Sequence, residues 1–94
     1  MAEYAVKSLD QLVRAGCAPA GITAQARIVD NPPGAPGPWV EISAVKIIAE
    51  QRFYFGGMLK PDELARLGPV AVARAFNAQA IHALAKIELL LPNA

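Results

Sequence analysis

The chain has 94 residues, 54% of them hydrophobic and 18% charged, with a net charge of +1. This length predicts a single domain over residues 1–94. One cysteine and one histidine cannot provide an intramolecular disulfide or a closed zinc site, so we expect no metal and no cofactor. Lys and Arg alternate with Asp and Glu and form no basic run, so nucleic acid is not an expected partner.

The N-terminal segment does not have the pattern of a secretory signal. Glu3 lies within it and no apolar stretch follows. The longest charge-free segment of the C-terminal half, between Arg74 and Lys86, contains Asn77 and His82 and is too short to span a membrane. We therefore expect no membrane association, and a cytoplasmic protein or one incorporated into a larger assembly such as a virion.

The first predicted element is a short helix. Ser8 suits the N-cap and Gln11 the third helical position of a capping box, and Gly16 suits the position after the helix. Residues 17–21 then form a turn that contains Pro19. Cys17 is expected to be a small buried apolar residue rather than a reactive thiol.

A β-hairpin is predicted around a loop rich in proline and glycine. Residues 22–30 alternate between apolar and polar side chains, which favours a half-buried strand, although a helix from Thr23 is the alternative. Residues 31–38 form the exposed loop. Residues 39–49 favour a strand at their start, and a helix is equally consistent with residues 46–51. The aromatic residues 53–55 and the Gly-Gly pair that follows are expected to end this element.

Two helices are predicted over residues 61–91. Pro61 suits the first helical position, Gly68 ends the first helix, Pro69 begins the second, and Pro92 stops it. At about 100° per residue, one arc of the second helix carries its predicted core face. That face comprises Val72, Phe76, Ala80, Ala83, Ile87 and Leu90.

The opposite side of this helix is polar but poor in charge. It carries Arg74, Gln79, His82 and Lys86, diluted by alanines. Alanine is the best helix former and fills solvent positions readily, but small side chains also allow another backbone to approach closely. The alanines and two neighbouring apolar residues are therefore candidate partner-binding residues: Ala71, Ala75, Ala78, Ile81, Ala85 and Leu89.

The aromatic residues supply the remaining candidates for partner binding. Phe53, Tyr54 and Phe55 are consecutive, so their three rings cannot all point one way and at least one is expected at the surface. Trp39 follows the proline-rich loop and is included as a fourth candidate. Each would be an anchor of the kind that dominates protein interfaces.

Catalytic chemistry is not predicted. A lone histidine on the polar side of a helix is typical of a solvated residue, and nothing in the spacing pairs His82 with Cys17. Asp62 and Glu63 are neighbours on a helix and point apart, and their position is explained by the helix dipole. The Gly56-Gly57 pair lacks the context of a phosphate-binding loop. We therefore expect a protein that is not an enzyme.

Residues 62–68 (DELARLG) and 72–77 (VARAFN) resemble the helix-turn-helix of bacterial repressors. The resemblance covers 16 residues and implies DNA binding through residues 61–77. The segment after Gly68 is shorter than in that motif, and Pro69 lies in the turn. Val70 and Ala71 stand where bases would be read, and neither can make bidentate base contacts.

The sequence as a whole predicts a small α+β domain with a leading helix, one β-hairpin and a helical C-terminal half; an all-α domain is the alternative. The low charge, the alanine-rich helix side and the aromatic residues favour a non-catalytic assembly or adaptor protein whose partner is a protein, either itself or a different chain. A phage-type structural or connector protein fits this description. A small DNA-binding or host-directed regulator using residues 61–77 is the alternative function.

Overall fold

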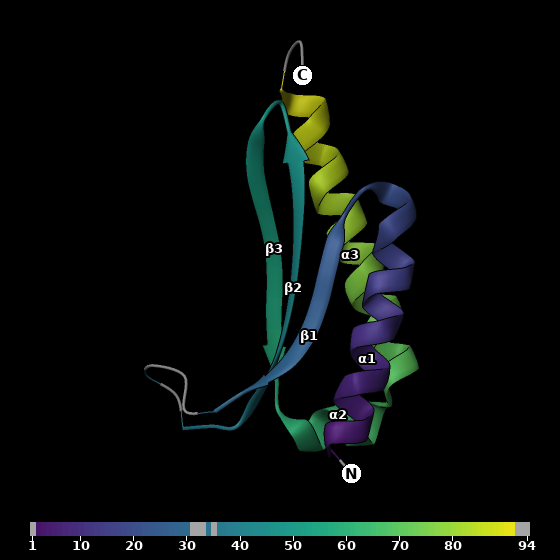
Figure 1. Ribbon diagram of the computed structural model, residues 1–94, viewed down its shortest axis with the longest axis vertical. Helices are drawn as coiled ribbons and strands as arrows, with labels where there is room; N and C mark the ends of the chain where they lie inside the picture. The colour runs from purple at the N-terminus through teal and green to yellow at the C-terminus, as the bar shows by residue number, and fades with distance from the viewer. Residues whose placement is uncertain (1, 31–33, 35, 92–94) are drawn as a thin grey trace.

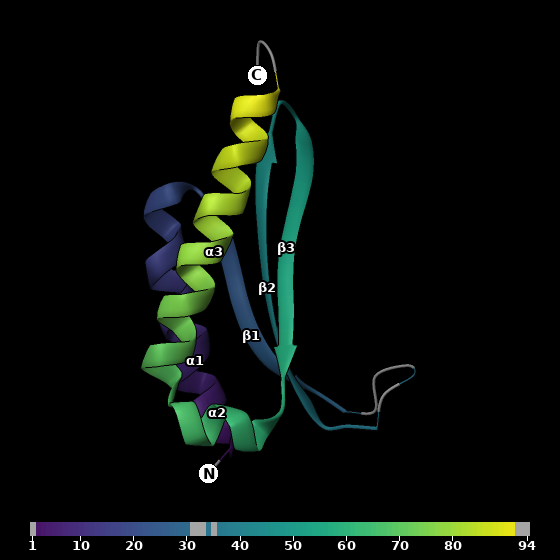
Figure 2. The same ribbon diagram turned by 180° about the vertical axis from the view of Figure 1, so that it is seen from behind.

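The computed structural model describes residues 2–30, 34 and 36–91, and it shows one sheet covered by helices on a single face (Figures 1 and 2). Both α1 and α3 lie on that face, and the sheet is antiparallel with the strand order β1-β2-β3. The predicted α+β class is confirmed, and the all-α alternative is wrong. The elements in chain order are α1 (Ala2–Cys17), the 3-10 turn η1 (Ala18–Ala20), β1 (Thr23–Val29), β2 (Trp39–Ile48), β3 (Gln51–Leu59), α2 (Pro61–Leu67) and α3 (Pro69–Leu90).

The leading helix is longer than predicted at both ends. α1 starts at Ala2, so Ser8 lies inside the helix and is not its N-cap, and Gly16 is also helical. The helix extends because Val6 adds one more turn to the buried stripe, which carries apolar residues three or four positions apart. Gly21, at φ 75°, takes the left-handed conformation that follows the 3-10 turn. The buried stripe consists of Val6, Leu9, Val13 and Cys17.

The predicted hairpin around the proline-rich loop is confirmed. β1 and β2 pair antiparallel, with Ala24 opposite Ala44 and Ala26 opposite Ile42. These side chains are all buried beneath the helices, as the alternating pattern predicts for one face of a strand. Of the predicted loop 31–38, residues 31–33 and 35 lie outside the described residues.

A third strand, β3, was not predicted. β2 continues as a strand to Ile48, and Ala49 and Glu50 then turn the chain with φ of 52° and 66°. Two successive left-handed residues make the tight hairpin turn that suits the twist of a sheet. Ala49-Glu50 lacks the Asn-Gly or Asp-Gly signal of such turns, so this turn could not be predicted from the local sequence. The Gly-Gly pair at 56–57 lies within β3 and does not end it.

The C-terminal helical pair is confirmed, but the buried face of α3 is rotated from the predicted one. Phe76 and Ala80 are buried as expected, whereas Leu90 is 72% exposed. Ala73 and Leu84 are buried although they were not predicted to be. The rotation arises because α3 packs against α1 as well as against the sheet, and its last turns extend past the end of α1 (Figures 1 and 2). The predicted stop at Pro92 lies outside the described residues.

Candidate functional site

The candidate residues on α3 lie mostly in one solvent-exposed stripe. Ala71, Ala75, Ala78 and Ala85 are all exposed, and Leu89 is 87% exposed. Their spacing of three, four or seven residues places them on the same side of the helix. Ile81 departs from this group because its side chain is partly buried and packs against the hydrophobic core.

The three consecutive aromatic residues divide between the two faces of the sheet. Phe53 and Phe55 point toward the helices and pack against the core, and the Phe55 ring lies 5.6 Å from that of Phe76. Tyr54 points the other way and is 69% exposed on the uncovered face. Alternation along a strand explains the division. Of these three residues, Tyr54 is the one with a mostly exposed side chain.

Trp39 is held within its own chain at the start of β2. Its indole Nε1 donates a hydrogen bond to the backbone oxygen of Pro36 at 3.0 Å. The ammonium of Lys60 lies 5.5 Å from the centre of its ring, in the geometry of a cation–π contact. Trp39 therefore fixes the end of the β1–β2 connection against the residue that follows β3.

An apolar groove, which the sequence did not predict, separates α3 from β3. Its volume is about 350 Å³. β3 is an edge strand, and Gly57 occupies one of its positions facing the helices. A Cβ atom on Gly57 would meet no atom within 4 Å. The missing side chain between Phe55 and Leu59 thus leaves the groove open. Prominent among its lining residues are Ile42, Met58, Leu67, Ala71, Ala75 and Phe76.

A signal for this groove is present in the sequence once β3 is recognised. Phe53, Phe55 and Leu59 are large apolar residues at alternate positions, and Gly57 interrupts them. Glycine inside a strand often marks a place where another group approaches closely. Because residues 53–57 were expected to end the preceding element, this alternation was not interpreted as a strand.

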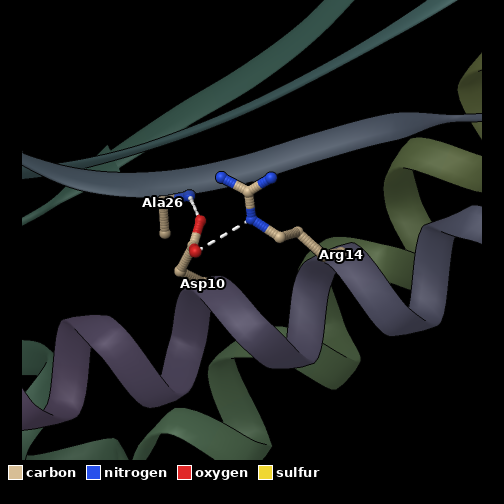
Figure 3. A network of polar contacts seen from close by, with 3 residues as sticks. All are labelled: Asp10, Arg14 and Ala26. Atoms are coloured by element: carbon tan, nitrogen blue, oxygen red, sulfur yellow. Dashed lines mark hydrogen bonds and ion pairs between the residues drawn. The ribbon is translucent and has the colours of Figure 1, made fainter.

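At the opposite edge of the sheet, α1 supplies a hydrogen-bond partner for one backbone N–H of β1. One carboxylate oxygen of Asp10 in α1 accepts a hydrogen bond from the backbone N–H of Ala26 in β1 at 2.9 Å, and the other accepts one from Arg14 Nε at 2.9 Å (Figure 3). Burial raises the pKa of Asp10, but the two hydrogen bonds and the positive charge of Arg14 together outweigh burial, so the pKa lies below its ordinary value. α1 therefore covers the edge at β1, whereas the groove adjoins the edge at β3.

The uncovered face of the sheet is more polar than the groove. Arg27 and Glu41 form an ion pair across β1 and β2 with a separation of 3.0 Å. Between the polar residues of this face, Ile47 and Tyr54 are 65% and 69% exposed. This mixed surface resembles the ordinary solvent face of an antiparallel sheet.

Cys17 and His82 lie in different environments. Cys17 is fully buried, and its Sγ donates to the side-chain oxygen of Asn77 at 3.4 Å. Burial raises the pKa of the Cys17 thiol, which opposes formation of a nucleophilic thiolate. His82 is exposed on the outer side of α3. Among the described residues, no group of three or more His, Cys, Asp or Glu side chains could hold a metal ion.

Comparisons with protein-family models, with curated proteins and with solved structures give no match to this chain. In the part of the chain that the structure describes, no helix is both long and apolar enough to cross a membrane.

Proposed function

We propose that this protein is a non-catalytic assembly protein that works as a subunit of a homo-oligomer or of a larger complex. The observation that carries the proposal is the concentration of exposed apolar side chains along α2, α3 and the adjoining edge strand. Met58 and Leu67 line one groove with Ala71 and Ala75, and clustered apolar surface of this kind is typical of a protein-binding surface. The large members of this group are Met58, Leu67, Val70, Leu89 and Leu90, with exposures of 46% to 87%.

The exposed alanines of α3 support the same proposal. Ala71 and Ala75 line the groove, so the stripe and the groove form one continuous surface. Small side chains let a partner backbone come close, and their burial costs little conformational entropy. In this role the protein needs no cofactor, and it acts in the cytoplasm or within a larger particle, as a connector or structural component does.

Light scattering or sedimentation velocity over a hundredfold range of protein concentration tests this proposal. We expect the mass to rise with concentration from that of one chain toward that of a defined oligomer. A strict monomer at every concentration would exclude self-assembly and leave only a different protein as partner. Tight DNA binding with a log–log salt slope of several units would instead favour a DNA-binding regulator that uses residues 61–77.

Charged substitutions on the exposed alanine stripe of α3 test whether this stripe is the assembly interface. Ala75→Glu and Ala78→Glu place a carboxylate in the proposed interface, so each should dissociate the oligomer while circular dichroism shows unchanged helicity. Arg52→Glu is the control, because Arg52 is exposed in β3 on the same uncovered face of the sheet as Tyr54, away from the stripe. If Ala75→Glu and Ala78→Glu assemble like the wild type, this side of α3 is not the interface.

A further inference from the structure

β3 is an edge strand, and its outer side is free in the part of the chain that the structure describes. The strand order β1-β2-β3 gives it one neighbouring strand. Among the described residues, no loop and no side chain forms a hydrogen bond with the backbone of β3 outside the sheet. An uncovered edge presents a row of backbone N–H and C=O groups that can pair with another strand. The outer edge of β3 is therefore a candidate interaction surface.

Every second residue of β3 directs its backbone polar groups to this outer edge. The two-residue turn after Ile48 is closed by a hydrogen-bonded pair of Ile48 with Gln51. In an antiparallel ladder, hydrogen-bonded pairs alternate with pairs that are not hydrogen-bonded. The odd-numbered residues of β3 therefore bond to β2, and the even-numbered residues turn their N–H and C=O groups outward. The outward-directed residues are Arg52, Tyr54, Gly56 and Met58.

The two edges of the sheet differ in how they are protected. At β1, the outward N–H of Ala26 is already bonded to the Asp10 carboxylate at 2.9 Å, so an added strand would have to displace that side chain. β3 carries no proline, and Arg52 is the one charged residue among its nine. Prolines and charged side chains are common means of protecting a sheet edge. The sheet can therefore be extended more readily at β3 than at β1.

We propose that β3 pairs antiparallel with β3 of a second copy of this chain, about a two-fold axis at Phe55, and so joins two three-stranded sheets into one. This inference rests on the self-assembly proposed above. Phe55 is the middle residue of β3. Pairing centred there places Gln51 opposite Leu59 and gives every outward-directed backbone group of the strand a partner. A register displaced by two residues leaves the groups at one end of each strand unpaired.

The side chains of β3 are complementary to themselves in this register. On the face covered by the helices, Phe53 of each copy comes opposite Gly57 of the other. On the uncovered face, Tyr54 comes opposite Gly56. An aromatic ring beside a glycine of the neighbouring strand covers backbone that the glycine leaves exposed, and cross-strand pairs of this kind stabilise sheets. The two-fold axis forms each pair twice, and the dimer closes on itself.

The charges of β3 are also compatible with this pairing. Arg52 comes opposite the uncharged Met58, and the two Arg52 residues lie six positions apart along the paired strands, or about 20 Å. Pairing uses the backbone of Arg52 and leaves its side chain on the uncovered face, so Arg52→Glu should still assemble. Met58 lines the same groove as Ala71 and Ala75 of α3. The paired edge and the alanine stripe therefore belong to one side of the molecule.

Site-directed disulfides test the register. Residues directly opposite each other in an antiparallel pair have Cα atoms about 5.5 Å apart, and a disulfide needs less than about 7 Å. An equimolar mixture of Arg52→Cys and Met58→Cys should therefore give a mixed covalent dimer on mild oxidation, identified by a mass tag on one chain. Neither variant alone should crosslink, because its two thiols lie about 20 Å apart. The wild type is the control, since Cys17 is buried.

The outcomes separate this inference from the proposed function. Efficient self-crosslinking of Arg52→Cys or Met58→Cys alone would overturn the register centred on Phe55. A mixture that does not crosslink, together with a wild type that still sediments as an oligomer, would overturn the strand pairing but leave self-assembly intact. A wild type that is monomeric at all concentrations would overturn both.

A proline in β3 tests the backbone hydrogen bonds. The N–H of Tyr54 points to the outer edge, so Tyr54→Pro removes no hydrogen bond to β2, and we expect a native circular dichroism spectrum. Tyr54→Ala is the matched control, because it removes the same ring and keeps the N–H. The dimer dissociation constant should be at least tenfold higher for Tyr54→Pro than for Tyr54→Ala. Equal dissociation constants for two folded variants would overturn the pairing of β3 with its own copy.

Discussion

Where α1 crosses α3, Asn77 lies against Gly16, and no room remains between them for a Cβ atom on residue 16. The Asn77 side-chain amide is held at both of its ends. Its nitrogen donates to the backbone oxygen of Leu12, and its oxygen accepts from Cys17 Sγ, each at 3.4 Å. Gly16 thus allows the close approach of α1 and α3. This contact explains why a glycine is present within α1.

Gly16→Ala should destabilise the protein by about 1–3 kcal/mol, as overpacking does in other cores. In an unobstructed helix the same change would stabilise by about 0.5–1 kcal/mol. Urea unfolding followed by circular dichroism measures the difference. The double variant Gly16→Ala/Asn77→Ala should regain part of the loss because it removes the obstructing amide. A Gly16→Ala protein as stable as the wild type would contradict this account.

Asp10 should make stability depend on pH. Its pKa is lower in the folded protein than the unfolded value of about 3.9. The stabilisation that the Asp10 carboxylate gives to the folded state is therefore present above that value, and it is lost as the pH falls through the folded pKa. Asp10→Ala should cost about 1–2 kcal/mol at pH 7.

Urea unfolding of the wild type and Asp10→Ala at pH 7 and pH 3 checks this expectation. The difference between the two proteins should shrink at pH 3, because below about 3.9 the unfolded chain binds a proton at Asp10 more readily than the folded chain does. Asp10→Asn is the matched control, because it keeps an acceptor for the Ala26 N–H without the charge. A difference that is the same at both pH values would indicate that Asp10 acts through packing.

Cys17 should resist thiol reagents in the native protein. Its side chain is buried, and desolvation raises the pKa of the thiol. At pH 8 we expect iodoacetamide to react at least a hundredfold more slowly with the native chain than with the chain in urea. Ala78→Cys provides an exposed cysteine for comparison, measured at a concentration where the protein is monomeric. Equal rates for Cys17 in the native and unfolded chains would show that it is accessible.

Two leucines of α2 should separate folding from assembly. Leu64 is fully buried, so Leu64→Ala should cost about 2–5 kcal/mol, which is a large share of the stability of a small domain. Leu67 is 50% exposed in the groove, so Leu67→Ala should change unfolding by less than about 1 kcal/mol. It should nevertheless weaken self-association. Thermal unfolding and sedimentation of the same samples measure both effects, and an equal loss of stability in the two variants would contradict the assignment.

The helices at 61–67 and 69–90 and the strand at 23–29 could be predicted because their signals are local. Proline at the first helical position, Gly68 between the helices and the alternation along residues 22–30 each act within a few residues. The start of α1 and the existence of β3 were not predicted, because neither feature has a local signal. The turn at Ala49-Glu50 carries no local signal, and it is the pairing of β3 with β2 across the sheet that makes it a hairpin.

The exposed alanine stripe of α3 could be predicted, but the groove beside it could not. Helical periodicity identifies which residues share one side of α3, and the alanines found there are indeed exposed. Which side of a helix is buried depends on the elements that pack against it. Because α1 packs against α3, the buried side of α3 includes Ala73 and Leu84. The sequence by itself therefore determined the helices, the first β-hairpin and the α+β class. Only the tertiary structure placed Gly57 opposite α3 and so opened the recess, because that contact depends on strand register and helix packing between distant parts of the chain.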